Sequence, residues 1–165
     1  MRSLISIAAA TALAVTLAGC GENETAATSN SATAPAKPPE LSDADRQALL
    51  AAFPAPYNTA DLKNGQAKFG LCRSCHTITP GGANMTGPNL HGIFGELAAR
   101  NPQYRYSDVL KNAGIVWDAS HLDEWLANPR TYLPGNKMSF VGLKDAKDRT
   151  DLIAFLMVET GYKPR

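Results

Sequence analysis

Two cysteines and a histidine stand close together in the run Cys72-Arg73-Ser74-Cys75-His76. Two thiols at this spacing add as thioethers to the two vinyl groups of a porphyrin, so the motif is typical of a covalently attached c-type haem. The histidine that follows then lies under the iron, where its imidazole can bind as the proximal ligand. The run therefore predicts one haem c, held through Cys72 and Cys75, with His76 on its iron.

The same pair of cysteines also occurs in zinc sites and in thiol redox proteins. A zinc site needs two further ligands at a suitable spacing, whereas the remaining cysteine, Cys20, and the histidines His91 and His121 lie far apart in the sequence. A thioredoxin-like pair is expected after a strand of a βαβ unit, and residues 60–71 have a helical pattern instead. Haem attachment is favoured, and the motif alone leaves zinc and dithiol chemistry open.

An electron carrier also needs a second axial ligand, so that the iron changes charge without changing partners. Met138 is the candidate, because Pro134 and Gly135 predict an irregular loop that can hold its thioether against the iron. A thioether favours ferrous iron and raises the reduction potential relative to a second imidazole. The less favoured alternatives are two methionines and two histidines: Met85, Met157, His91 and His121.

The N-terminal residues have the pattern of an export signal, with one positive charge at Arg2, an apolar run over residues 4–18 and small residues before Cys20. The apolar run is shorter than the roughly 20 residues that a membrane span needs. Residues 17–20, Leu-Ala-Gly-Cys, resemble a bacterial lipobox, which predicts a lipoprotein-type signal peptide over residues 1–19 and a lipid on Cys20. The alternatives are an ordinary signal peptide or an uncleaved anchor. A chain exported in this way is expected in the bacterial periplasm, anchored to a membrane by its lipid.

Residues 21–40 are rich in small and polar residues and lack large apolar ones, so we expect them to be disordered and to act as a tether. Residues 41–53 predict a short helix that ends before Pro54. The expected organisation is a signal peptide (1–19), a lipidated cysteine with its tether and short helix (20–57), and a haem domain (58–165).

The balance of charge excludes one class of partner. The whole chain has 16 basic and 15 acidic side chains, and removal of residues 1–19 takes away only Arg2 among them, which leaves 15 of each. A balanced chain has no global basic field for nucleic acid. Electrostatic attraction to a partner must therefore come from a local patch.

Four segments of the haem domain predict helices: 61–71, 107–112, 120–128 and 146–160. In the third of them, Leu122, Trp125 and Leu126 recur at helical spacing and share a face, and Ser120 begins a capping-box pattern. The residues at 79–95 are rich in glycine and proline and predict a loop. No pair of strands is expected, so the fold class is all-α.

Residues 60–162 resemble the class I cytochromes c, close to the mitochondrial protein and the bacterial cytochromes c2. Six segments carry the resemblance in the order of the family: 72–76, 86–95, 114–117, 128–129, 132–138 and 151–156. The resemblance implies a loop-rich, all-α fold in which three to five helices pack around one covalently bound haem. This implication agrees with the helix pattern.

The roles of the family's site residues can be transferred position by position. Cys72 and Cys75 are implied to hold the haem covalently. His76 is implied as the proximal ligand and Met138 as the distal one. The carbonyl of Pro88 is implied to accept a hydrogen bond from the proximal imidazole, which fixes its tautomer.

The resemblance also implies roles in the cleft wall and the core. Tyr106 and Trp117 are implied to hydrogen-bond a haem propionate. A structural contact between the first and last helices is implied for four residues: Gly65, Phe69, Leu152 and Phe155.

The chain departs from the family pattern at three positions. Glu96, Trp125 and Leu110 stand where the family commonly has arginine, tyrosine and asparagine. The family's arginine lies near the propionates, and Arg100 and Arg105 are the candidates to replace it.

The function implied by this resemblance is transfer of single electrons between membrane respiratory complexes, without catalysis by the carrier. The donor is expected to resemble a cytochrome bc1 complex and the acceptor a haem–copper oxidase, and the carrier is expected to be a monomer that binds no nucleic acid. Docking around the exposed haem edge is implied for four basic residues: Arg73, Arg130, Lys137 and Lys144. The alternatives are a haem enzyme and a gas sensor, both of which need Met138 to be off the iron.

Overall fold

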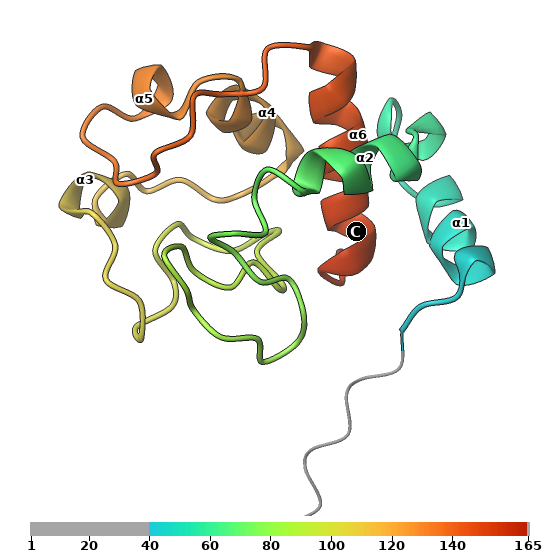
Figure 1. Cartoon of the computed structure of the whole chain (residues 1–165), viewed down its shortest axis with the longest axis horizontal. Coiled ribbons are helices and arrows are strands. Elements are labelled where there is room, and N and C mark those ends of the chain that lie inside the picture. The colour runs from blue at the N-terminus through green and yellow to red at the C-terminus, as the bar shows by residue number, and fades with distance from the viewer. Residues whose placement is uncertain (1–39, 165) are drawn as a thin grey trace, which may run out of the picture. The chain divides into compact units, whose positions relative to one another are not determined.

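The computed structural model describes residues 40–164. Within this part the fold is helical and rich in loops, with six α-helices and one 3₁₀-helix (Figure 1). They are α1 (Asp43–Ala51), η1 (Tyr57–Thr59), α2 (Leu62–Phe69), α3 (Asp108–Lys111), α4 (Ala119–Ala127), α5 (Pro129–Tyr132) and α6 (Ala146–Glu159). The predicted all-α class is confirmed.

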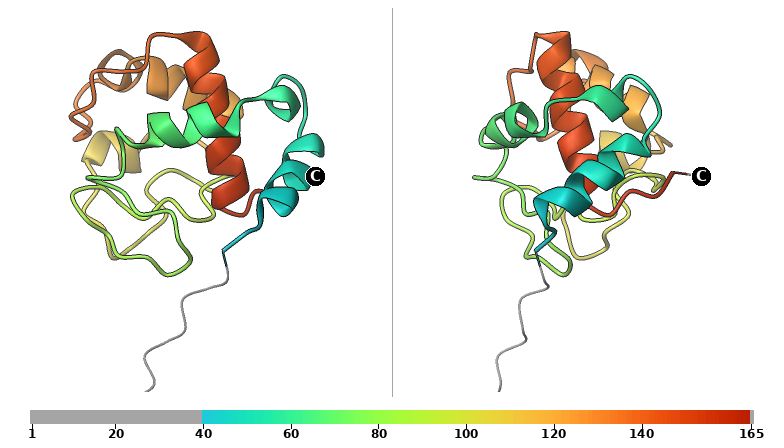
Figure 2. Two further views of the ribbon diagram at one scale, coloured as in Figure 1. Left: turned by 45° about the vertical axis from the view of Figure 1, so that its right-hand side comes forward. Right: turned by 90° about the vertical axis from the view of Figure 1, so that its right-hand side faces the viewer.

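Helices α2 and α6 pack across each other, although they are far apart in the sequence (Figure 2). Gly65 permits the close approach, since a Cβ on this residue would lie 2.2 Å from the Asp151 carbonyl oxygen and 2.7 Å from the Phe155 Cβ. Beside it, the ring centroids of Phe69 and Phe155 are 5.7 Å apart, and Leu152 is 1% exposed. The helix contact implied by the family resemblance is present.

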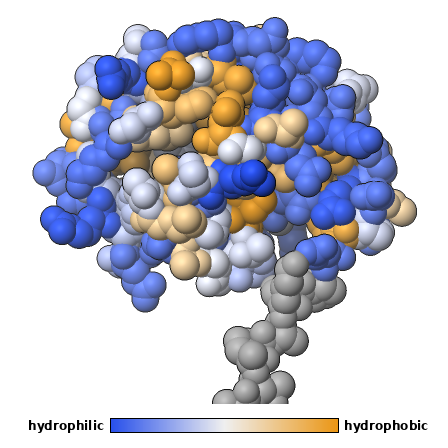
Figure 3. All heavy atoms as spheres, in the orientation of Figure 1, coloured by the Kyte–Doolittle hydropathy of each residue, from blue (hydrophilic) through white to orange (hydrophobic). Residues whose placement is uncertain are grey.

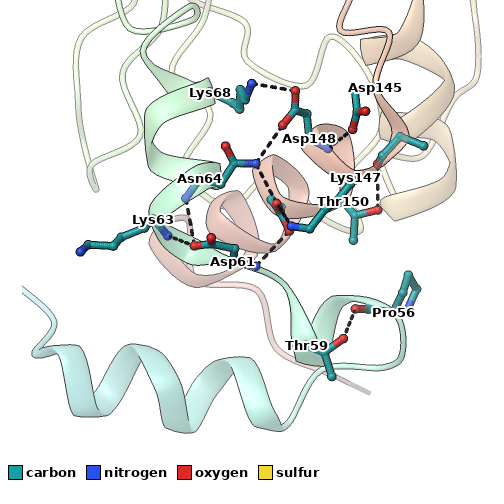
Figure 4. A network of polar contacts seen from close by, with 12 residues as sticks. Pro56, Thr59, Asp61, Lys63, Asn64, Lys68, Asp145, Lys147, Asp148 and Thr150 are labelled. Atoms are coloured by element: carbon teal, nitrogen blue, oxygen red, sulfur yellow. Dashed lines mark hydrogen bonds and ion pairs between the residues drawn. The ribbon is translucent and has the colours of Figure 1, made fainter.

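Polar contacts join the same two helices, among them those of Asn64 and Lys68 with Asp148 (Figure 4). A buried carboxylate adds to them. Asp151 is 1% exposed and accepts hydrogen bonds from the Asp61 backbone N–H at 2.9 Å and the Asn64 side chain at 2.8 Å. It also accepts one from Lys147 Nζ at 2.6 Å. Burial alone would raise the pKa of Asp151, but the hydrogen bonds from Lys147, Asn64 and the Asp61 N–H outweigh it and hold the pKa below its usual value. The carboxylate is therefore charged at neutral pH, and its charge helps to join α2 to α6.

Helix α1 forms where the sequence predicts a short helix over residues 41–53. Ser42 begins it through a capping box, in which its hydroxyl accepts from the Asp45 N–H and the Asp45 side chain accepts from the Ser42 N–H. Arg46 Nε donates to Glu159 Oε1 at 2.6 Å, which links α1 to the end of α6.

The apolar face of α1 belongs to the main core. Leu50 and Phe53 are 5% and 4% exposed, and the rings of Phe53 and Tyr162 meet edge to face at 5.5 Å. The boundary expected at residue 58 is therefore too late, because these apolar side chains pack on α6 and the residues after it. The packed domain includes α1.

Helices α4 and α5 differ in detail from the sequence prediction. The cap of α4 is Asp118 and not Ser120, because the Asp118 carboxylate accepts from the His121 N–H at 2.8 Å. The sequence pattern treats Pro129 only as the end of this helix, but Pro129 also stands at the first position of α5, where its missing N–H is not needed. The Asn128 side chain caps this short helix. With α5, residues 58–164 hold five α-helices, α2 to α6, which agrees with the three to five expected around the haem.

Long loops connect α2 to α3, in agreement with the loop predicted over residues 79–95. Pairing of the β type is limited, within residues 40–164, to an isolated antiparallel bridge between Leu97 and Val116. Among the helices of this same part, none combines the length and the apolar character that a membrane crossing requires. The expected signal peptide, Cys20 and most of the tether lie outside the described residues.

Candidate functional site

Segments from distant parts of the sequence line one cleft. They are the turn after α2, the loop before α3, helix α4 and the residues that follow α5. The walls are mainly apolar and include Leu90, Ile93, Leu110, Leu122 and Phe140. Figure 3 shows apolar side chains gathered in a hollow on this face of the domain, with hydrophilic residues around them. Such a cleft suits a large apolar ligand that is held by a few polar groups.

The turn after α2 brings Cys72, Cys75 and His76 to the cleft. Helical hydrogen bonding continues into this turn, because the Cys72 N–H donates to the Phe69 carbonyl at 2.8 Å. The N–H groups of Cys75 and His76 donate to the Cys72 carbonyl at 3.0 and 2.9 Å. Since α2 is fixed on α6, both sulfur atoms and the imidazole are fixed with it.

The imidazole of His76 is constrained on two sides. Its Nδ1–H donates to the Pro88 carbonyl oxygen at 2.7 Å, which is the contact implied by the family resemblance. Gly87 lies against the ring, and a Cβ on Gly87 would be 2.3 Å from Cε1 and 2.6 Å from Nε2. Burial lowers the pKa of His76, and the hydrogen bond to Pro88 opposes this shift without cancelling it. A neutral imidazole with its proton on Nδ1 leaves the Nε2 lone pair free to bind iron.

The two alternative uses of the cysteine pair gain no support. Burial, with a smaller contribution from Cys75, raises the pKa of the Cys72 thiol to about 11, whereas a thiol redox site needs a lowered pKa. Across residues 40–164, no group of three or more histidine, cysteine, aspartate or glutamate side chains is placed to hold a metal ion. A zinc site therefore lacks its further ligands in this part of the chain.

Met138 is the methionine that reaches the cleft. Of the three methionines in residues 40–164, it alone lines the cleft. Met85 is 47% exposed, and Met157 is 2% exposed within the core around α6. The described histidines other than His76, which are His91 and His121, do not line the cleft either. One imidazole and one thioether therefore share the cleft, which fits the two axial positions of a haem iron.

A group of polar side chains also lines the cleft. Tyr106, Trp117 and Arg100 belong to it, and burial raises the pKa of Tyr106, so its hydroxyl remains a donor at neutral pH. Ser107 is 7% exposed, and its buried Oγ has no hydrogen-bond partner in the described structure. A buried hydroxyl without a partner costs about 1–3 kcal/mol, and a carboxylate of a haem would supply the missing acceptor. Sequence reasoning missed Ser107, although its position next to Tyr106 was a usable signal.

Two of the departures from the family pattern lie in the cleft wall. Trp125 is 7% exposed, and its ring centroid is 5.5 Å from that of Trp117 and 6.0 Å from that of Tyr132. Leu110 also lines the cleft. Both positions therefore add apolar surface where the family commonly has a more polar side chain.

The third departure concerns the family's arginine. Glu96 stands at that position and does not line the cleft, and neither does Arg105. Arg100 lines the cleft, and its guanidinium donates a hydrogen bond to the His91 carbonyl. Arg100 is thus the better placed of the two candidate cations.

The four cations predicted for docking are exposed: Arg73, Arg130, Lys137 and Lys144. Lys137 lines the cleft, and its Nζ is 3.3 Å from the Arg105 carbonyl oxygen and 3.4 Å from that of Tyr106. Lys144 Nζ donates to the Ala127 carbonyl at 2.8 Å. In the part of the chain that the structure describes, none of the four forms an ion pair.

Known proteins that are similar to this chain are cytochromes c, which agrees with the geometry of the cleft. Cytochrome c of Kluyveromyces lactis is 40% identical over 106 residues, which are 64% of this chain and 96% of that protein. Cytochrome c2 of Rhodomicrobium vannielii is 41% identical over 105 residues, which are 64% of this chain and 84% of that protein. The chain belongs to the class I cytochrome c family.

Structural similarity agrees with this membership. The solved structure of cytochrome cH from Methylobacterium extorquens matches with a TM-score of 0.55 at 39% identity, over 59% of this chain and 97% of that one. No protein-family model matches the chain. Cytochromes c are electron carriers and not enzymes, and they hold one haem c covalently through two cysteines. In this cytochrome c those cysteines are Cys72 and Cys75, and the apolar cleft and the unpaired Ser107 hydroxyl fit the haem.

Proposed function

We propose that this cytochrome c transfers single electrons with His76 as the proximal iron ligand and Met138 as the distal one. Bound haem supplies one iron that alternates between the ferrous and ferric states. The observation that supports the assignment is that an imidazole with a free Nε2 and a single described thioether line the same cleft. The Pro88 carbonyl keeps His76 in one tautomer, and the apolar walls exclude water.

The polar group of the cleft is proposed to bind the haem propionates. Tyr106, Trp117 and Ser107 would donate hydrogen bonds, and Arg100 would add a positive charge. Donors and a cation together stabilise a buried carboxylate more than either does alone. Their combined effect would keep the propionates ionised inside the domain.

An absorption spectrum tests the axial ligands. We expect the oxidised protein to show the weak red-end band of sulfur bound to ferric iron, and the reduced protein to bind carbon monoxide only slowly. Met138→Ala should abolish the band, because it removes the thioether. Met85→Leu should retain it, because Met85 lies outside the cleft. A high-spin spectrum or prompt carbon monoxide binding by the wild-type protein would instead indicate an open iron position, as in a gas sensor.

The four exposed cations, of which Lys137 lines the cleft, are proposed to dock an acidic surface of a redox partner. Their charges are not neutralised by ion pairs within residues 40–164, whereas Arg46 on α1 and Lys68 on α2 are paired with carboxylates. Attraction of this kind raises the association rate and weakens as salt is added.

A rate measurement tests the docking surface. We expect Lys137→Gln combined with Lys144→Gln to slow electron transfer at low ionic strength and to reduce its salt dependence. Lys63→Gln is the matched control, because Lys63 is an exposed lysine on α2 that does not line the cleft. An equal effect of the control, or a wild-type rate that does not respond to salt, would remove this docking surface.

The physiological partners are proposed to be a donor of the cytochrome bc1 type and an acceptor of the haem–copper oxidase type. The proposal rests on the family resemblance and on the exposed cations proposed for docking. Purified complexes of both classes test it directly, with reduction of the haem by the first and oxidation by the second. Failure of either reaction at low salt would exclude that partner.

A lipid on Cys20 is proposed to tether the carrier to a membrane of the bacterial periplasm. The support is the sequence alone, namely the lipobox at residues 17–20 and the polar linker that follows. A tether raises the effective concentration of the carrier near membrane partners. Metabolic labelling with a radioactive fatty acid should label the wild-type chain and not Cys20→Ala. An unlabelled wild-type chain would leave a soluble or otherwise anchored carrier.

A further inference from the structure

The loop that carries Met138 is bound by the side chain of Asn136. Its Oδ1 accepts from the Met138 backbone N–H at 2.8 Å. Its Nδ2 donates to the carbonyl oxygens of Pro129 and Leu133, both at 2.8 Å. Asn136 also lines the cleft and is half-buried. The amide group of Asn136 therefore makes three hydrogen bonds within the segment that joins α5 to Met138.

The acceptors of these bonds lie on a fixed part of the domain. Pro129 is almost completely buried and begins α5. The Pro129 carbonyl also accepts from the Leu133 N–H at 3.1 Å, and the carbonyl of Leu133, the residue after α5, also accepts from the Asn136 N–H at 3.2 Å. The Asn136 side chain adds a second hydrogen bond to each of these two carbonyls. Gly135, at φ +87°, turns the chain back so that Asn136 reaches the carbonyls of Pro129 and Leu133.

We propose that Asn136 is the positioning residue for the distal ligand, which it holds by fastening the Met138 backbone to α5. The inference rests on the proposed function of Met138 as that ligand. Asn136 itself is not an iron ligand. Its hydrogen bonds determine the fraction of molecules in which the Met138 loop is away from the iron. In that fraction, the sixth coordination position of the iron is open to another ligand.

The size of the effect follows from the number of bonds. An added ligand such as imidazole binds ferric iron only when Met138 has left it, so its apparent affinity is proportional to the open fraction. Loss of three hydrogen bonds of ordinary strength should raise that fraction roughly ten- to hundredfold. Asn136→Ala should therefore bind imidazole roughly ten- to hundredfold more tightly than the wild type.

Asn89 offers a matched control on the proximal side of the cleft. Its Nδ2 donates to Thr77 Oγ1 at 2.6 Å and to the Thr79 carbonyl at 3.0 Å. Its Oδ1 accepts from the His91 N–H at 3.0 Å. Asn89 thus also lines the cleft and makes three hydrogen bonds with one amide group, but it fastens the loop beside His76 and not the loop of Met138.

The experiment is an imidazole titration of the oxidised holoprotein, in which the loss of the sulfur-to-iron band measures binding. It is carried out on the wild type, Asn136→Ala and Asn89→Ala. The expected result is tighter binding by Asn136→Ala and an affinity within about threefold of the wild type for Asn89→Ala. Equal affinities of Asn136→Ala and the wild type would overturn the inference. An equal gain in Asn89→Ala would also overturn it, because the effect would then be general loosening.

A second variant covers the case in which Asn136→Ala does not incorporate haem. Asn136→Asp has the same shape and retains the acceptor for the Met138 N–H, but it sets an oxygen against the carbonyl oxygens of Pro129 and Leu133. We expect it to bind imidazole at least tenfold more tightly than the wild type. Failure of the proposed function is seen separately, since the wild-type protein would then lack the sulfur-to-iron band before any imidazole is added.

Discussion

The two sides of the cleft hold their ligating residues in different ways. On the proximal side, the turn of Cys72, Cys75 and His76 continues the hydrogen bonding of α2, and α2 is fixed on α6 by Gly65 and a buried carboxylate. On the distal side, Met138 lies in a loop that side chains fasten to the rest of the domain.

Because of this difference, we expect stability and ligand exchange to depend on different sides of the cleft. The proximal residues can leave the cleft only if the packing of α2 on α6 is disturbed, which is a global event. The distal loop can open by breaking a few local hydrogen bonds, and openings of this kind require less free energy than global unfolding. We therefore expect changes on the helical side to lower stability, and changes on the loop side to alter ligand exchange.

The largest effect is expected from Phe53→Ala, which weakens the support of α6. Phe53 is 4% exposed and packs on Tyr162, so the truncation should lower the free energy of unfolding by about 4 kcal/mol. Imidazole affinity of the folded protein should stay within about twofold, because the loop is untouched. Urea denaturation measures the loss, with Val141→Ala, at an 83% exposed residue, as the control. A loss no larger than that of the control would show that α1 does not belong to the core in solution.

A methyl group on Gly87 should disturb the proximal side directly. The new Cβ would lie 2.3 Å from Cε1 of His76, so the imidazole must move and its bond to Pro88 is strained. We expect Gly87→Ala to lose about 3 kcal/mol of stability and to change the electron paramagnetic resonance spectrum of the oxidised protein. Gly114→Ala adds a methyl group in open space at φ +65°. It should lose only about 1 kcal/mol and keep the spectrum of the wild type, and a spectral change of equal size would contradict the role of Gly87.

Acid should weaken the proximal support through Asp151. Because hydrogen bonding holds the pKa of this carboxyl below its usual value, its contribution is complete above about pH 4 and is lost as the pH falls through the lowered pKa. Asp151→Asn should cost about 2 kcal/mol at pH 7, and the difference from the wild type should shrink as the pH falls below about 4. Denaturation curves at pH 7, 5 and 3 measure this, and a difference that is constant over the range would argue against it.

The smallest effect is expected at the far end of the distal loop. Lys144 Nζ donates to the Ala127 carbonyl at 2.8 Å, but the lysine is exposed to solvent. Lys144→Met should therefore cost only about 0.5 kcal/mol, and it should raise imidazole affinity about twofold. Lys63→Met, on the helical side, should leave that affinity unchanged. A tenfold effect of Lys144→Met would mean that this end of the loop, and not Asn136, controls opening.

Local sequence patterns predicted most of the helices and the haem-binding run, because both depend on residues that are near neighbours. The helices expected at 61–71 and 146–160 are present at Leu62–Phe69 and Ala146–Glu159. Helix α5 was missed because Pro129 ends one helix and begins the next. At position 129, a proline is compatible both with the end of one helix and with the first residue of the next, so the sequence does not distinguish the two.

The contacts that the sequence did not predict join residues across loops. The close contact of Gly87 with His76 and the hydrogen bond from Asn136 to α5 leave no periodic pattern in the sequence, because they depend on the path of irregular backbone. Leu50 and Phe53 are apolar in the sequence, but which surface buries them is determined by the tertiary structure. Sequence similarity supplied the contact of His76 with Pro88, which spacing alone does not contain.

The placement of Trp117 and Trp125 has a practical consequence. They are the two tryptophans of the whole chain, and both line the cleft. A porphyrin in the cleft would lie close to both and accept their excitation energy, so the intact holoprotein should be almost non-fluorescent. Indole emission would rise only as the macrocycle and the tryptophans separate, which makes its intensity an optical signal, free of any added dye, for how far the domain has come apart.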